Sequence, residues 1–276
     1  MDRYGEILLL GPCRLKCFYC LGREMKKAAK ISCLGKHFTE WPNFNVFIQT
    51  LLDEGIDKVY ISSVNTDPLL YGYISELIDF LNTKFKYVGI RINAAMLNIT
   101  KYSLLDKLTE EISISLNSNR IGRSLRIAGP AAGQEWWNLC EYLDTKPGEK
   151  HTIRLSIVVN RHNEDCIPEI LGFIRDKYSK QVQYVQLRKV YKYKDKRHTK
   201  EDWEAFENTK QWLEDNSSSQ DGFYESRVFS FGGLKVSLWE DVFSPNSVKS
   251  LNYFPTGLIS RNHLLVPAFE NEEISD

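Results

Sequence analysis

The chain has 276 residues, and Lys plus Arg and Asp plus Glu each number 36, so its formal net charge is zero. No global field therefore steers it toward nucleic acid or a membrane surface. Hydrophobic residues make up 42% of the chain and charged residues 26%, which is typical of a folded globular protein. The length fits one α/β domain with a large core.

The beginning of the sequence, MDRYGEILLLGPC, has no basic leader followed by a long apolar segment, and no apolar run reaches membrane-spanning length. We therefore expect a cytoplasmic protein with no membrane partner. In that reducing compartment stable disulfides are uncommon, so clustered cysteines indicate metal binding or redox chemistry.

Apolar patterns alternate between strand and helix periods along the first two thirds of the chain. Six strands are predicted from short apolar or β-branched runs at residues 6–10, 58–64, 88–94, 111–117, 152–160 and 182–191. Five helices are predicted from apolar residues at helical spacing at residues 43–55, 73–85, 101–110, 133–143 and 167–178. This alternation predicts parallel strands with right-handed crossovers, in either a doubly wound sheet or a partial barrel.

The pattern changes after residue 198. A helix is predicted over 199–216 with Thr199 as its N-cap, and two hairpins are predicted to turn at Gly232-Gly233 and at Pro255-Thr256-Gly257. We expect a core of residues 1–198 and a helix and antiparallel hairpin extension, residues 199–276, packed on that core.

Three of the six cysteines lie in one short loop directly after the first predicted strand. The stretch GPCRLKCFYCLG places Cys13, Cys17 and Cys20 at the spacing CxxxCxxC. Tetrahedral zinc takes four ligands, and Cys33 or His37 could complete such a site. Alternatively, three thiolates hold a [4Fe-4S] cluster and leave one iron open to an outside ligand. The loop follows the carboxyl end of a parallel strand, where ligands of α/β folds gather.

The motif resembles the signature of the radical S-adenosylmethionine (SAM) superfamily, in which an aromatic residue, here Tyr19, precedes the last cysteine of CxxxCxxC. The resemblance implies a partial (βα)6 TIM-like barrel in which Cys13, Cys17 and Cys20 bind the cluster and SAM chelates the fourth iron. It also implies reductive cleavage of SAM to a 5′-deoxyadenosyl radical that abstracts hydrogen from a substrate. Such an enzyme is oxygen-sensitive and needs an electron donor such as a flavodoxin or ferredoxin.

The resemblance extends to polar residues after the second and fourth strands. Asp67 stands where the superfamily often has the acidic residue that meets the SAM amino group, although a plain turn with Pro68 would also explain it. Ser115 is the candidate for the SAM ribose, and Asn117 shares its strand face, where it would otherwise cap a helix. Arg123 is the candidate for the SAM carboxylate, Arg120 and Arg126 are the alternatives, and any of the three could instead be solvated.

The fifth strand has Arg154, Ser156 and Asn160 at even spacing, so all three share one face. The resemblance suggests that Ser156 contacts the ribose and that Arg154, as a residue of the catalytic site, faces the substrate. An arginine within a strand is costly unless it is paired, so a salt bridge to an acidic neighbour is the alternative.

The substrate is predicted from a basic stretch after the sixth strand. RKVYKYKDKRHTK, residues 188–200, combines cations with two tyrosines, which suits phosphate and base contacts. A nucleotide or nucleic acid is therefore the first hypothesis. The alternatives are a peptide- or protein-modifying maturase or activating enzyme, and a zinc-binding module without catalysis. The sequence has no second cysteine cluster, so auxiliary iron-sulfur sites are not expected.

Overall fold

The computed structural model describes residues 3–23, 31–146, 152–190, 199–221, 226–240 and 250–261. Six parallel strands form the centre of its sheet and follow one another in sequence order. They are β1 (Tyr4–Leu9), β2 (Lys58–Ser63), β3 (Tyr87–Asn93), β4 (Ile112–Ser115), β5 (Ile153–Val159) and β6 (Val182–Lys189). The predicted fold class, a partial (βα)6 barrel with a hairpin extension, is confirmed.

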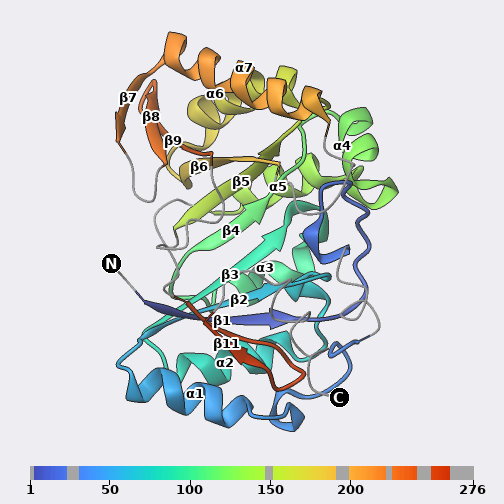
Figure 1. The fold of residues 1–276 in the computed structure, drawn as a ribbon, viewed down its shortest axis with the longest axis vertical. Coiled ribbons are helices and arrows are strands. Elements are labelled where there is room, and N and C mark those ends of the chain that lie inside the picture. Colours follow the sequence, from blue (N-terminus) through green and yellow to red (C-terminus); the bar gives the residue numbers. More distant parts are fainter. Residues whose placement is uncertain are drawn as a thin grey trace.

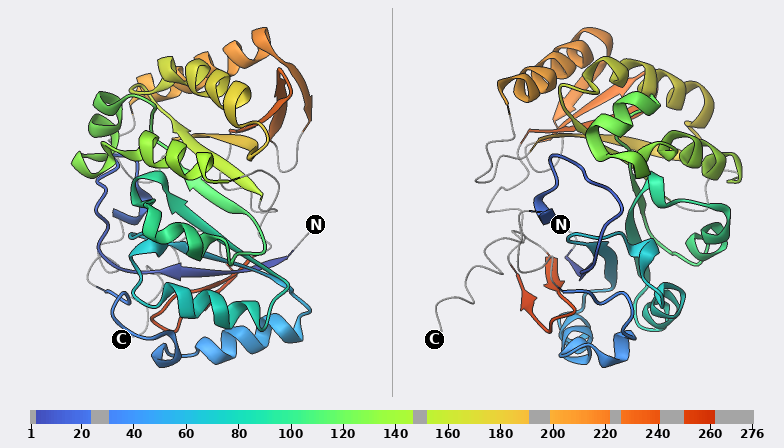
Figure 2. Two further views of the ribbon diagram at one scale, coloured as in Figure 1. Left: turned by 180° about the vertical axis from the view of Figure 1, so that it is seen from behind. Right: turned by 90° about the vertical axis from the view of Figure 1, so that its right-hand side faces the viewer.

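Helices connect these strands and cover the convex face of the curved sheet (Figures 1 and 2). The crossover helices are α1 (Phe44–Asp53), α2 (Ile74–Asn82), α3 (Ile99–Leu105), α4 (Ile121–Ala128), α5 (Glu135–Asp144) and α6 (Ile167–Tyr178). Of these, α4 was not predicted from the sequence. Figure 2 shows the dark blue segment after β1 on the opposite, concave side.

The side chains of the central strands alternate between an apolar and a polar face. On β3, for example, Val88, Ile90 and Ile92 are buried toward the helices, whereas Arg91 and Asn93 line a cavity on the other face. A parallel sheet whose two faces are both packed by apolar residues would show a near-continuous hydrophobic run instead. The alternation therefore places a polar, ligand-accessible surface on the concave side.

The residues after 198 extend the same sheet at both edges. They form α7 (Lys200–Asn216), β7 (Ser218–Asp221), β8 (Arg227–Phe231), β9 (Leu234–Trp239), β10 (Ser250–Tyr253) and β11 (Ile259–Ser260). The two predicted hairpins, β8 with β9 and β10 with β11, are antiparallel, but β9 joins β6 and β10 joins β1 in parallel. The full strand order is β11-β10-β1-β2-β3-β4-β5-β6-β9-β8-β7.

Thr199 caps α7, as predicted, and forms a capping box with Asp202. None of the helices in the described ranges is both long and apolar enough to span a membrane.

Candidate active site

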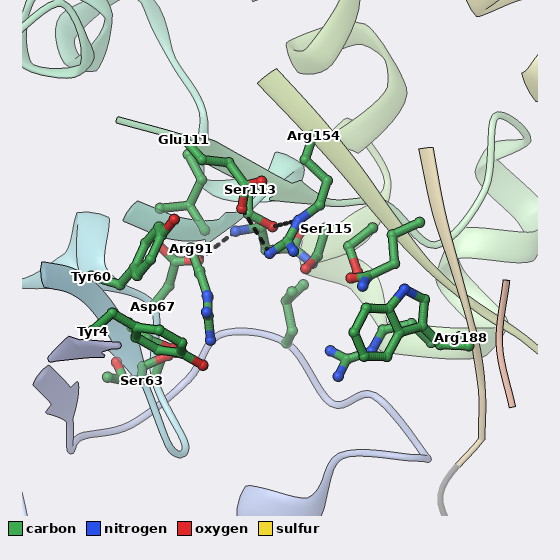
Figure 3. Close-up of a pocket in the computed structure, with 18 of the residues that line it drawn as sticks. Tyr4, Tyr60, Ser63, Asp67, Arg91, Glu111, Ser113, Ser115, Arg154 and Arg188 are labelled. Atoms are coloured by element: carbon green, nitrogen blue, oxygen red, sulfur yellow. Dashed lines mark hydrogen bonds and ion pairs between the residues drawn. The ribbon is translucent and has the colours of Figure 1, made fainter. Parts of the chain in front are cut away.

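A cavity of about 530 Å³ opens on the concave face, next to the loop that follows β1 (Figure 3). Its wall is built from polar side chains at alternating positions of neighbouring strands. Asn93, Ser115, Ser156 and Gln186 are register partners in one row across β3 to β6. A second row, one pleat closer to the amino ends of the strands, consists of Arg91, Ser113, Arg154 and Tyr184.

The cysteine loop, residues 11–22, is held between α4 and the segment after β2. The Lys16 backbone N–H donates to the Ala128 carbonyl at 2.8 Å. The Thr66 hydroxyl donates to the Pro12 carbonyl at 3.0 Å. These contacts fix the loop beside the cavity, and Cys13 is one of the residues that line it.

The three thiols of the loop lie near enough to influence one another. Burial, followed by the proximity of Cys20 and Cys13, raises the pKa of the Cys17 thiol to about 12. Thiols in this state need a strongly cationic centre to become thiolate ligands. Across the described ranges, no three His, Cys, Asp or Glu side chains converge closely enough to hold a single metal ion. Three thiols on one loop fit a multi-iron cluster better than one zinc ion.

The two residues considered as a fourth zinc ligand have other contacts. Cys33 is buried, and its Sγ lies 3.1 Å from the Leu10 carbonyl oxygen. His37 Nε2 lies 3.1 Å from Glu76 Oε2. Neither forms a metal-binding group with the loop within the part of the chain that the structure describes.

Tyr19 and Asn117 belong to one hydrogen-bond network behind the loop. The Tyr19 hydroxyl donates to Asn117 Oδ1 at 2.5 Å, and Asn117 Nδ2 donates to Glu135 Oε2 at 2.8 Å. The same carboxylate accepts from the Ser118 N–H at 3.1 Å and from the Ser124 hydroxyl at 2.5 Å. Burial raises the pKa of Glu135 to about 7. Asn117 is thus a buried link between the loop and α5.

Asp67 is buried at the cavity wall, and both of its carboxylate oxygens accept backbone hydrogen bonds. Oδ1 accepts from the Leu69 N–H at 2.9 Å and Oδ2 from the Asn93 N–H at 2.7 Å. The first bond caps the short 3-10 helix Pro68–Leu70, so the predicted alternative of a turn with Pro68 is present. Burial raises the pKa of the Asp67 carboxyl to about 7. Asp67 therefore combines a structural role with a position at the cavity.

Ser115 and Ser156 are adjacent in the row nearest the cysteine loop and both line the cavity. Within the described ranges, neither hydroxyl has a protein hydrogen-bond partner. Two hydroxyls that face an open space without partners are available to a bound ligand.

Arg154 lines the cavity and also forms the salt bridge considered as its alternative. Its Nη2 lies 3.1 Å from Glu111 Oε1, and its Nε donates to the Ser113 hydroxyl at 3.1 Å. The charge of Arg154 is thus already balanced before a ligand binds.

The structure does not bring Arg123 into the cavity wall. Its Nη2 lies 2.8 Å from Asp165 Oδ2, and Arg120 contacts the same carboxylate at 3.4 Å. Both arginines lie on or next to α4, outside the residues that line the cavity.

Sequence reasoning missed Arg91, Glu111 and Gln186 as cavity residues, and it read Arg188 only as part of a basic stretch. All four occupy the alternating positions that were used for Ser115 and Ser156. The same period-two criterion, applied to β3, to β6 and to the residue directly before β4, would have found them.

No protein-family model matches the sequence, and neither does any curated protein. Solved structures do match. Streptococcus suis SuiB has a TM-score of 0.66 at 13% identity, over 98% of this chain and 64% of SuiB. SuiB bound to its precursor peptide SuiA gives 0.65 at 14%, over 100% of this chain and 61% of SuiB. Native anSMEcpe with bound AdoMet gives 0.53 at 13%, over 77% of this chain and 61% of anSMEcpe.

Coproporphyrinogen III oxidase (HemN) from Escherichia coli, named a radical SAM enzyme, gives a TM-score of 0.50 at 8% identity over 79% of this chain and 54% of HemN. The present chain therefore spans less than two thirds of each of these proteins. At such low identity the likeness is one of fold. The radical SAM fold, predicted from the cysteine motif and the alternation of strands and helices, is confirmed for this chain.

Proposed function

We propose that this protein is a radical SAM enzyme that acts on a peptide or protein. The observation that carries the proposal is the position of the CxxxCxxC loop at the carboxyl end of β1, directly beside a polar cavity on the concave face of a radical SAM fold. When bound, a [4Fe-4S] cluster and SAM would supply a 5′-deoxyadenosyl radical that takes hydrogen from the substrate.

In this proposal the cysteine loop holds the cluster, through Cys13, Cys17 and Cys20. Tyr19 and Asn117 support the loop from behind, because their hydrogen bond connects it to the buried Glu135. These two residues position the cluster ligands.

The cavity wall binds and orients SAM. The hydroxyls of Ser115 and Ser156, which have no partner among the described residues, would donate to or accept from its ribose. Asp67 still has an unused lone pair on each oxygen for an ammonium group, which would favour the ionised carboxylate. Arg123 would have to leave Asp165 to reach a SAM carboxylate, so its proposed role is the least supported.

A peptide substrate is better supported than a nucleotide. SuiB and anSMEcpe, which share the fold, were solved with the precursor peptide SuiA and with a Cp18Cys peptide, respectively. The basic stretch behind the nucleotide hypothesis falls mostly on residues 191–198, outside the described ranges. Two of its described members are paired: Lys189 with Glu207 at 3.5 Å and Lys200 with Glu204 at 3.0 Å.

The proposal is tested by anaerobic reconstitution with iron and sulfide, followed by dithionite as a substitute for the flavodoxin or ferredoxin that we expect as the electron donor. We expect a cluster absorbance and the formation of 5′-deoxyadenosine from SAM by the wild type. Cys17→Ala should lose both, because two thiolates do not retain the cluster in this geometry.

Cys140→Ala is the matched control. Cys140 is a half-buried cysteine on α5 outside the loop. We expect it to support cluster formation and SAM cleavage like the wild type. Bound zinc without 5′-deoxyadenosine in the wild type would establish the zinc-binding module instead.

A further inference from the structure

Three arginines enter the cavity, and two of them are already paired. Arg91 Nη1 lies 2.6 Å from Glu6 Oε1, and Arg154 Nη2 lies 3.1 Å from Glu111 Oε1. Arg188, on β6, has no hydrogen bond or ion pair to any residue in the described ranges. Among the described residues, it is the cation of the cavity that has no acidic partner.

The guanidinium of Arg188 points across the cavity toward Arg91 (Figure 3). The Nε atoms of both arginines are buried and have no hydrogen-bond partner. Burial, followed by the nearby charges of Arg154 and Arg91, lowers the pKa of Arg188 to about 10. A partly buried cation that faces a second cation and has no partner among the described residues is costly, and a bound anion would reduce that cost.

The charge count at the cavity favours an anion with a single charge. Its lining residues include four cations and two carboxyl groups, Glu111 and Asp67. Glu110, Glu6 and Glu111 balance Lys58, Arg91 and Arg154, and Asp67 is assigned above to the ammonium group of SAM. One carboxylate would balance Arg188, whereas a phosphate dianion would leave an excess negative charge. The planar fork of a guanidinium also matches the two oxygens of a carboxylate.

We infer that Arg188, together with Arg91, binds a carboxylate of the peptide substrate inside the cavity. The carboxylate belongs either to an acidic side chain or to the C-terminus of the peptide. This inference rests on the proposed function, because it names the group by which the same site recognises its substrate. Trp239, the register neighbour of Arg188 on β9, also lines the cavity and offers an apolar surface beside that group.

The test is anaerobic equilibrium dialysis of the reconstituted full chain, with saturating SAM, against short peptides. One probe is a blocked alanine peptide with a central glutamate, and its neutral counterpart has glutamine. A third probe, N-acetyl-glycylglycine, has only a C-terminal carboxylate. We expect one of the two carboxylate probes to bind at least tenfold more tightly than the glutamine peptide, and the stronger of them identifies the source of the carboxylate.

Arg188→Met should abolish this preference. Arg188→Lys should retain only part of it, because an ammonium group lacks the two parallel N–H donors with which a guanidinium binds both carboxylate oxygens. The matched control is Arg227→Met on β8, since Arg227 pairs with Glu214 and does not line the cavity. It should keep the full preference. The comparison of glutamate and glutamine peptides on the wild type needs no variant, so it stands even if an Arg188 variant fails to fold.

Equal affinity of the wild type for charged and neutral probes would overturn the inference. Binding of the acidic probe only when SAM is left out of the dialysis would overturn it as well, because that result would assign Arg188 to the SAM carboxylate. Stronger competition by inorganic phosphate than by either carboxylate would overturn it too. Formation of 5′-deoxyadenosine by the wild type is measured separately. Cleavage of SAM without carboxylate preference would refute only this inference, and preference without cleavage would refute only the proposed function.

Discussion

Glu135 is a carboxylate that is buried among hydrogen-bond donors and has no ion-pair partner in the described ranges. Burial raises its pKa from the usual 4.5 to about 7. The folded state therefore holds the proton more tightly than the unfolded state. This stabilisation is fully present below about pH 4.5 and is lost as the pH rises through about 7.

Glu135→Gln removes this titration. We expect the wild type to lose about 2 kcal/mol of unfolding free energy relative to the variant between pH 5 and pH 8. Urea unfolding at several pH values measures the difference. Parallel curves for the two proteins would show that Glu135 ionises normally.

Arg154 and Glu111 form a largely buried pair in the cavity wall, and Tyr184 donates to the same carboxylate at 2.6 Å. Arg154→Met should destabilise the protein by about 3 kcal/mol, because it leaves Glu111 without its cation. Adding Glu111→Gln should recover much of that loss. A double-mutant cycle by urea unfolding gives the coupling energy, and a loss in the double variant equal to the sum of the single losses would contradict the pairing.

The sequence could reveal that residues share a face, but not which of them are paired. Even spacing correctly placed Ser115, Ser156 and Arg154 on one side of their strands. It could not show that Arg123 is held by Asp165, because that contact joins two helices 42 residues apart in sequence. The burial of Glu135 could not be predicted either. An acidic residue in the first turn of a helix is usually exposed, so its sequence position did not indicate burial.

At the scale of single elements, the turn between β8 and β9 needs two glycines. Gly232 and Gly233 have φ values of 55° and 91°, which L side chains rarely adopt. Gly233→Ala should lower the unfolding free energy by about 1 kcal/mol through backbone strain alone, because no atom lies within 4 Å of the added Cβ.

Gly172→Ala is the matched control. Gly172 lies inside α6, and its added Cβ also meets nothing within 4 Å. This variant should raise the unfolding free energy by up to about 1 kcal/mol. Thermal or urea unfolding of both variants checks the prediction, and equal signs for the two changes would contradict it.

Local signals predicted some elements well and missed others. The glycine pair marked the β8–β9 turn, and Thr199 marked the start of α7. Helix α4 was missed because it is only eight residues long and two arginines and a glycine interrupt the apolar residues of its sequence, IGRSLRIA. Gly129, which ends this helix at a φ of 81°, was the available signal.

For the whole molecule, the described strands after residue 198 belong to the same sheet as the six central strands. Val236 on β9 and Tyr253 on β10 are fully buried, and their strands pair with β6 and β1. We expect a chain that ends at residue 198 to expose both sheet edges and to aggregate or unfold without a cooperative transition. A soluble truncated chain with native-like unfolding would contradict this.

Two substitutions at adjacent residues test the same point in the full chain. Val236→Asp places an unpaired charge in the core, and we expect a loss of about 4 kcal/mol or more. Lys235→Asp changes an exposed neighbour on the same strand and should alter the unfolding free energy by less than about 0.5 kcal/mol. Comparable losses in the two variants would mean that β9 does not belong to the core.

The strand order at the two edges could not be predicted from the sequence. Both hairpins were recognised because their turns are local, but the parallel contacts of β9 with β6 and β10 with β1 join segments far apart in the chain. No local sequence pattern indicates which edge strand of the sheet a hairpin will pair with.

The position of β1 between β2 and β10 sets an order of events during synthesis. β1 leaves the ribosome before its partner β10, which follows roughly 240 residues later; at about 5–20 residues per second this takes roughly 10–50 s. During that time one edge of β1 has no strand beside it, and an open edge can pair with other chains. We therefore expect the nascent protein to depend on chaperones until β10 has been synthesised.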